Sequence, residues 1–312
     1  MTAADLASAL EGKKEGCEWR CRCPLHGGRS LCVTDRDGKL LLVCRAGCSQ
    51  PEVIQALRTM GLWGNVACFE ISPPPPAPAP PNQDRRADRA TKMWSEAHPI
   101  TSGDPVHHYL GNRSIRLNAW PGDLRTHSAL SYWKTDDKGK PSKVGTFSGM
   151  LAVVRSSTGR PVALHRTYIT NDGQKASVDP VKKAYGVHPM QGGAVRLFPP
   201  KDGFLAVAEG IEDALSAWIL WRIPCWACLG TSGLMTFDPP AGVKKLIIFA
   251  DRDENQAGQR AAWVLADRME KKRMAVRVRI PSGHKDINQL LREPLDDESN
   301  TGNARDRRPR TS

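Results

Sequence analysis

From Gly203 onward, short apolar segments alternate with longer segments of helical character, and this alternation restricts the fold more than any other feature of the sequence. FLAVA (204–208), CWACLG (225–230), KKLIIFA (244–250) and MAVRVRI (274–280) have the length and composition of strands. Helices are predicted over 211–222 and about 257–272. Strands that alternate with helices favour βαβ units and a mostly parallel sheet. We therefore expect an α/β subdomain over residues 201–293.

The rest of the chain divides at a proline-rich segment. Residues 1–68 hold most of the cysteines and end in a predicted amphipathic helix over 51–60, and the prolines in 69–90 favour an extended linker. Residues 91–200 have helical segments around 92–97 and 105–111, followed by β-rich runs with turns at 156–160 and 171–173. The polar tail, 294–312, is expected to be disordered and basic. The predicted fold class is thus multidomain, α+β and α/β.

Carboxylates follow two of the predicted parallel strands. Glu209 comes directly after FLAVA, and Asp251 and Asp253 come after KKLIIFA. Ligands of open α/β sheets bind at the carboxyl ends of the strands, so these three side chains are expected to meet. Oxygen ligands of this kind suit Mg²⁺ or Mn²⁺. Glu212 and Asp213 are interpreted as first-turn helix residues that the helix dipole stabilises.

Seven of the nine cysteines lie in the first quarter of the chain. In a chain without a secretion signal, this crowding indicates metal ligation rather than disulfides. Cys23 and His26 form one close pair and Cys44 and Cys48 another, a spacing typical of a tetrahedral Zn²⁺ site. Cys21 is an alternative to Cys23, although the proline that follows Cys23 favours the latter. Cys17 and Cys32 are interpreted as packing residues.

Charge and hydropathy narrow the class of partner. Lys and Arg number 45 against 33 Asp and Glu, giving a net charge of +12, which favours a polyanion such as nucleic acid. The sequence contains no run of the roughly 18–20 apolar residues that a membrane span needs, and its start does not resemble a signal peptide. We expect a cytoplasmic protein without a membrane partner.

Two groups of motifs resemble known families. CPLHGGRSLCV and LVCRAGCSQPEVIQALRTMGLW resemble the CHC2-type zinc-binding domain of bacterial and phage primases, although three residues separate the last two cysteines here instead of two. FLAVAEGIEDALSA and KKLIIFADRDENQAG resemble the Toprim fold of bacterial-type primases, topoisomerases and some nucleases. GHKDINQLL resembles the closing segment of the Toprim primases, which makes Asp286 a further candidate metal ligand.

The resemblance implies a DNA primase that makes short RNA primers on a single-stranded DNA template, in a phage, plasmid or other mobile element. Glu209, Asp251 and Asp253 would be catalytic and hold magnesium, with Glu209 a ligand or a general base, while the zinc module would contact the template. Nucleoside triphosphates and template phosphates would be bound by basic side chains, for which the candidates are Arg166, Lys182, Lys183, Arg196 and Lys285. The sequence has no Gly-x-x-x-x-Gly-Lys-Ser/Thr loop, so a separate replicative helicase is the expected partner.

Two alternatives remain open from the sequence. A Toprim nuclease would use the same carboxylates with water as the nucleophile. A non-catalytic DNA-binding protein would keep the fold without the chemistry. A topoisomerase is less favoured, because none of the four tyrosines lies in a recognisable catalytic motif.

Overall fold

The computed structural model describes residues 2–16, 18–36, 39–46, 48, 50–63, 83–136, 140–254 and 256–293. Four sequence predictions lie outside these residues: the proline-rich part of the linker, the C-terminal tail from 294, and the placement of Cys17 and of Cys68. No helix among the described residues is long and apolar enough to cross a membrane.

The N-terminal module is a small antiparallel sheet flanked by two helices. Strands β1 (Lys13–Glu15), β2 (Glu18–Cys21), β3 (Leu31–Arg36) and β4 (Lys39–Cys44) pair in chain order. Helix α1 (Ala3–Ala9) begins at a capping box, in which the Thr2 hydroxyl accepts from the Asp5 amide and the Asp5 carboxylate accepts from the Thr2 amide. Helix α2 (Gln50–Thr59) follows the last cysteine pair, and buries Val53 and Leu57 as its apolar spacing predicts.

The middle of the chain is an antiparallel sheet with two helices. Helices α3 (Gln83–Ser95) and α4 (Pro105–Gly111) precede strands β5 (Leu124–Thr135), β6 (Pro141–Arg155), β7 (Pro161–Ile169), β8 (Lys182–Gly186) and β9 (Ala194–Val195). Strands β6 and β7 are antiparallel partners joined by the predicted turn at 156–160. Helix α3 starts well before the segment predicted from the sequence, because the residues that follow the prolines are charged helix formers.

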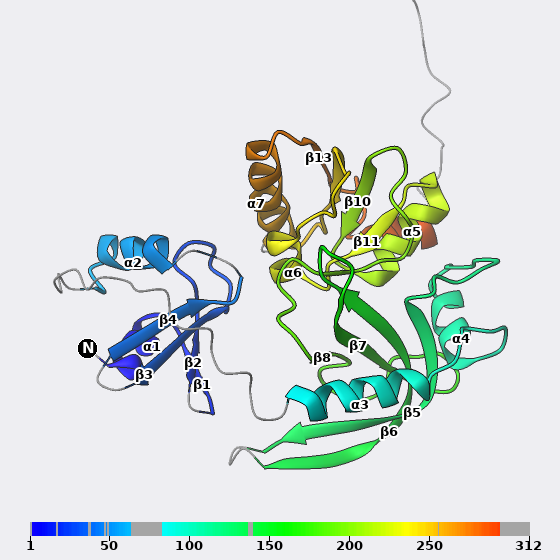
Figure 1. The fold of residues 1–312 in the computed structure, drawn as a ribbon, viewed down its shortest axis with the longest axis horizontal. Coiled ribbons are helices and arrows are strands. Elements are labelled where there is room, and N and C mark those ends of the chain that lie inside the picture. Colours follow the sequence, from blue (N-terminus) through cyan, green and yellow to red (C-terminus); the bar gives the residue numbers. More distant parts are fainter. Residues whose placement is uncertain are drawn as a thin grey trace, which may run out of the picture.

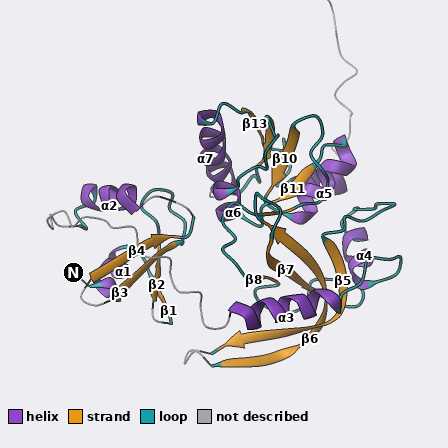
Figure 2. Ribbon diagram, in the orientation of Figure 1, coloured by secondary structure: helices purple, strands orange, loops and turns teal. Residues whose placement is uncertain are grey.

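The C-terminal part has the predicted alternation. It consists of β10 (Phe204–Ala208), α5 (Ile211–Trp221), β11 (Cys225–Ala227), α6 (Thr231–Thr236), β12 (Lys245–Phe249), α7 (Ala257–Lys271), β13 (Ala275–Arg279) and α8 (Ile287–Arg292). The four strands are parallel in the order β13-β12-β10-β11. Figure 2 shows helices α7 and α5 on opposite sides of these strands.

Alternate residues of β10 supply the two faces of this parallel sheet. Leu205 and Val207 pack with the α7 side, whereas Ala206 and Ala208 pack with α5. A strand buried on both faces must be apolar at every position, which explains the uninterrupted FLAVA segment.

One sheet runs through both the middle and the C-terminal parts (Figure 1). Its nine strands follow the order β13-β12-β10-β11-β9-β6-β7-β8, with β5 beside β6. The two-residue strand β9 makes the junction: Val195 pairs antiparallel with Ala227 of β11 on one side and with Val154 of β6 on the other. The parallel and antiparallel halves therefore share backbone hydrogen bonding.

Candidate active site

Glu209 and Asp251 lie at the same edge of the sheet, as predicted. Strands β10 and β12 are parallel neighbours, with Val207 opposite Ile248, so the residues after each strand emerge side by side. A Cβ built on Gly258, in the first turn of α7, would lie 2.5 Å from Glu209 Oε1 and 3.1 Å from the Asp251 carbonyl oxygen. Glycine at 258 thus lets α7 approach both acidic residues. The Gly258 amide also donates to Asp253 Oδ2 at 3.3 Å.

Glu209, Asp251 and Asp253 line a cavity of about 600 Å³. Six carboxylates face it, and they come from the ends of β10 and β12, the first turn of α5 and the start of α8: Glu209, Glu212, Asp213, Asp251, Asp253 and Asp286. Basic side chains complete its wall: Arg113, Lys175, Lys182, Lys285 and Arg292. Acidic and basic groups thus surround one space, which suits a ligand that carries both a cation and phosphates.

Three carboxylates of the cavity have raised pKa values. Burial, followed by the charges of Asp253 and Asp213, raises the pKa of Glu209 to about 7. Burial and the neighbouring Glu209 raise the pKa of Asp251 to about 7. Burial and Asp251 raise the pKa of Asp213 to about 8. Crowded carboxylates of this kind are stabilised when a cation binds between them.

Glu209 also has a carboxylate oxygen that is available to a ligand. Within the described part of the chain, its Oε1 atom is buried and has no hydrogen-bond partner. A buried oxygen without a partner costs free energy unless a ligand satisfies it. The donor set therefore fits Mg²⁺ or Mn²⁺. The six carboxylates are more widely spaced than a closed metal site would be. Among the described residues, the one group with three or more potential ligand atoms all within 4.8 Å of one another is Cys23, His26, Cys44 and Cys48 in the N-terminal module.

Glu212 and Asp213 belong to this cavity, although the sequence interpretation gave them only a helix-stabilising role. Asp213 Oδ1 accepts a hydrogen bond from the backbone N–H of Asn288 at 3.0 Å, which connects α5 to α8. For Glu212, burial opposes ionisation, but the Lys182 ammonium and the Tyr109 hydroxyl lower its pKa to about 2. The sequence signal that could have indicated this was that Glu212 and Asp213 lie three and four residues after Glu209, at the start of a helix on the edge of the sheet where ligands bind.

The predicted basic residues lie in different places. Lys285 and Lys182 line the cavity. Lys183 donates to the Trp133 carbonyl oxygen at 2.6 Å and lies 4.0 Å from the Tyr132 ring centroid. Arg196 donates to the carbonyl oxygens of residues 156 and 157, both at 2.8 Å, and lies over an indole ring. Neither Lys183 nor Arg196 is among the residues that line the cavity.

Arg166 lines a separate groove of about 640 Å³ beside α3. Trp133, whose exposed fraction is 49%, and Tyr185 lie in the same groove. The Arg166 guanidinium is 5.4 Å from the Tyr185 ring centroid, and Arg89 of α3 adds a further positive charge. The groove thus combines aromatic rings with arginines.

Asp286 combines a structural contact with a place on the cavity wall. It is the N-cap of α8, where its Oδ1 accepts from the Gln289 amide at 2.7 Å. It also lines the cavity and contributes to the raised pKa of Asp251. Its role as a metal ligand remains a prediction.

The predicted zinc ligands come together in the N-terminal module. The Sγ atoms of Cys23 and Cys48 are 3.9 Å apart, and His26 Nε2 lies 3.3 Å from Cys44 Sγ. A tetrahedral Zn²⁺ site with ordinary bond lengths requires ligand separations of roughly 3.5–3.8 Å. Cys21 is not part of this group: its sulfur lies 2.7 Å from a Cβ built on Gly12, in the module's core. The four residues fit zinc.

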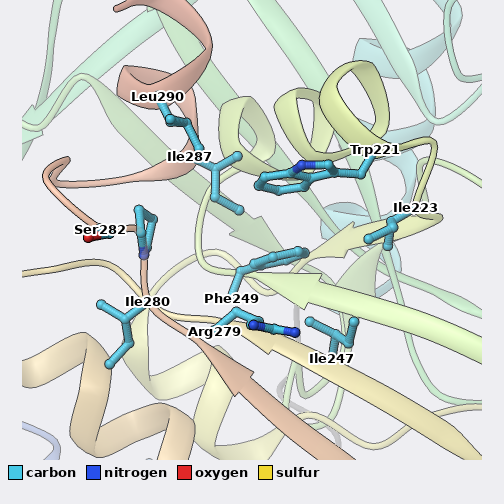
Figure 3. Close-up of a pocket in the computed structure, with 10 residues that line it drawn as sticks. Trp221, Ile223, Ile247, Phe249, Arg279, Ile280, Ser282, Ile287 and Leu290 are labelled. Carbon is cyan, nitrogen blue, oxygen red and sulfur yellow. The ribbon is translucent and has the colours of Figure 1, made fainter. Parts of the chain in front are cut away.

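A smaller hollow of about 390 Å³ lies between α5, α8 and strands β12 and β13 (Figure 3). The indole ring of Trp221 stacks on Phe249 with centroids 5.5 Å apart. Ile247, Ile287 and Leu290 supply further apolar lining, and among the described residues Arg279 is the one charged side chain that lines the hollow. This lining offers no group for acid–base or metal chemistry.

Two segments of the chain match known protein families. Residues 84–197 match the family described as Domain of unknown function (DUF7146), and residues 204–297 match the Toprim domain. A search of curated proteins gave no match.

Solved structures with a similar arrangement include three primases. A DNA primase domain from Pseudomonas aeruginosa is 15% identical, with 68% of this chain and 74% of that chain covered and a TM-score of 0.45. The zinc-binding and RNA polymerase domains of the Aquifex aeolicus primase are 17% identical, with 94% and 80% covered and a TM-score of 0.42. The primase fragment of the bacteriophage T7 primase-helicase protein is 20% identical, with 54% and 64% covered and a TM-score of 0.36.

The family match and the strand-end carboxylates coincide, since the matched residues begin at β10 and include Glu209, Asp251, Asp253 and Asp286. The C-terminal part of this chain, residues 204–297, is a Toprim domain.

Proposed function

We propose that the protein is a DNA primase of a phage, plasmid or other mobile element, which makes short RNA primers on single-stranded DNA. The observation that carries this proposal is the cavity at the carboxyl edge of the Toprim sheet. Its crowded carboxylates suit divalent cations, and the basic residues Lys182 and Lys285 on the same wall suit the phosphates of a nucleoside triphosphate.

Glu209, Asp251 and Asp253 would hold Mg²⁺ or Mn²⁺, with Asp286 as a further ligand. A divalent cation held by these residues would supply positive charge that offsets the negative charge developing during phosphoryl transfer. Glu209, whose pKa is raised to about 7, could alternatively accept the proton of the primer 3′-hydroxyl. Lys182 and Lys285 would orient the triphosphate.

The template would follow the groove beside α3. Trp133 and Tyr185 offer stacking surfaces for bases, and Arg166 and Arg89 offer charge for the phosphates. Lys183 lies on the neighbouring surface, next to Tyr132. The zinc module would contact the same strand. A separate helicase would expose that strand, and this partner remains an expectation from the sequence.

A template-dependent synthesis assay tests the proposal. The protein would be incubated with Mg²⁺ or Mn²⁺, labelled ribonucleoside triphosphates and a library of single-stranded DNA templates. We expect short labelled products that need both the metal and the template. Cleavage of the template without any incorporation would instead establish the Toprim nuclease.

The non-catalytic alternative needs a second measurement. Asp251→Ala should abolish synthesis and leave affinity for single-stranded DNA within about twofold, because Asp251 lies in the cavity rather than in the groove beside α3. Synthesis that persists in Asp251→Ala would refute the assigned role of this residue. A wild-type protein that binds single-stranded DNA, but neither synthesises nor cleaves, would favour the binding protein.

A further inference from the structure

Glu212 differs from the other carboxylates of the cavity because both of its oxygens already have partners. Oε1 accepts from the Tyr109 hydroxyl at 2.6 Å and lies 2.8 Å from Lys182 Nζ. Oε2 accepts from the same ammonium at 2.9 Å. Glu209, by contrast, keeps a buried oxygen without a partner in the described chain. Glu212 is therefore committed to Lys182, whereas Glu209 is available to a cation.

The three residues come from separate elements. Tyr109 lies on α4, Lys182 begins β8, and Glu212 lies in the first turn of α5. Tyr109 is fully buried, and its ring is covered by the Arg113 guanidinium at 3.7 Å from the centroid. The hydroxyl that reaches Glu212 is thus fixed by packing. Both α4 and β8 belong to the middle of the chain, so residues outside the Toprim domain complete its cavity wall.

Lys182 remains able to meet a ligand. Its side chain is 39% exposed and lines the cavity, and an ammonium has three donors, so the bonds to Glu212 leave capacity toward the cavity. A free lysine side chain samples many rotamers, and fixing it costs conformational entropy. The ion pair with Glu212 removes this freedom before a ligand arrives.

Stability alone is a weak explanation for such a pair. Burying the Glu212 carboxylate is costly, and apolar replacements of buried ion pairs often stabilise a protein equally well or better. We propose that Glu212, supported by Tyr109, is a positioning residue that holds the Lys182 ammonium toward the triphosphate of the incoming nucleotide. The inference rests on the proposed function, since it concerns the same cavity.

The test is a double-mutant cycle on Glu212 and Lys182 in the full chain, with primer synthesis and the affinity for Mg²⁺-ATP measured in parallel. Lys182→Met should weaken ATP binding at least tenfold and lower kcat. Glu212→Gln should leave ATP affinity within threefold, because Lys182 keeps its charge, but lower kcat at least tenfold because the ammonium is no longer held. In the Lys182→Met background, Glu212→Gln should change kcat by less than twofold.

Two further measurements separate positioning from a structural or metal-binding role. Glu212→Gln should keep the Mn²⁺ affinity of the wild type, whereas a metal ligand would lose it. Tyr109→Phe keeps the ion pair, so its loss of kcat should be only two- to fivefold, and that loss should also vanish in the Lys182→Met background. Melting temperatures would confirm that each variant is folded.

Additive effects in the cycle, or loss of Mn²⁺ affinity in Glu212→Gln, would overturn the positioning role of Glu212. If the wild type still makes primers, the proposed primase function is unaffected by that result. A wild type that makes no primers would overturn the proposed function, and the positioning role with it. The two failures are therefore distinguishable.

Discussion

Gly258→Ala is expected to make the protein more helical but less active. The substitution lies in the first turn of α7, where alanine is favoured over glycine by up to about 1 kcal/mol. The new methyl group would lie 2.5 Å from Glu209 Oε1, and ordinary contact begins at 3.4 Å. The Glu209 carboxylate must therefore retreat by about 0.9 Å, because the Asp251 carbonyl oxygen, 3.1 Å away, belongs to the backbone and cannot yield readily.

A displacement of this size is large for a carboxylate that is proposed to hold a metal ion. Catalytic groups must be held within about 0.5 Å, and a misplacement of about 1 Å can cost a hundredfold in rate. We expect Gly258→Ala to lower metal-dependent synthesis by about 10- to 100-fold and to weaken Mn²⁺ binding about tenfold. Isothermal titration calorimetry would measure the Mn²⁺ affinity, and thermal melting in EDTA would show whether the fold is retained.

Gly111→Ala is the matched control. Gly111 is also helical, at the end of α4, but a Cβ at this position meets nothing within 4 Å. It should leave Mn²⁺ affinity and synthesis unchanged. Wild-type metal affinity in Gly258→Ala would refute the assignment of Glu209 as a ligand held against α7.

Three further predictions concern the carboxylates and the zinc module. In EDTA, the free energy of unfolding should fall as pH rises from about 4 to 8, because the pKa values of Glu209, Asp251 and Asp213 are raised to about 7, 7 and 8 in the folded protein. The stability that each group contributes is fully present below its ordinary pKa in the unfolded chain. It is lost as the pH rises through the raised pKa of the folded state. Urea titrations should show this slope flatten in Mg²⁺, and an equal slope with and without the metal would contradict the site. Asp251→Asn should abolish synthesis yet stabilise the metal-free protein at pH 8 by about 1–2 kcal/mol, discounted for solvent screening, while Asp172→Asn in an exposed turn should do neither. Native mass spectrometry should find one zinc in the wild type and in Cys32→Ala but none in Cys48→Ser; zinc retained by Cys48→Ser would remove that ligand from the set.

The sequence was most informative where one local rule governed the structure. The strands β10 and β12 were predicted because strands buried on both faces must be largely apolar, and the helices α5 and α7 were predicted because long helices keep their periodicity. Glu209 and Asp251 could be placed at one sheet edge because each follows the carboxyl end of a predicted parallel strand. The two close pairs of candidate zinc ligands were predicted from their spacing, and the structure brings the four side chains together.

Tertiary contacts explain what the sequence did not reveal. Glu212 has the pattern of an ordinary first-turn acid, and its pairing with Tyr109 spans 103 positions, which no local pattern encodes. Strand β9 is too short to give any period. Helix α3 follows a run of prolines, so its start at Gln83 was obscured by the composition of the preceding segment.

Strand β9 also limits how such chains can be recombined. Val195 lies in the segment that matches the domain of unknown function, yet it covers the edge of β11 in the Toprim domain. In a hybrid whose Toprim domain is exchanged after residue 197, β9 comes from one protein and β11 from another. The edge of β11 is then covered only if these two strands can still pair. A Toprim fragment expressed by itself would present an open strand edge, which is the usual route to self-association of sheets. Evolutionary exchange would therefore be expected to move the two segments together.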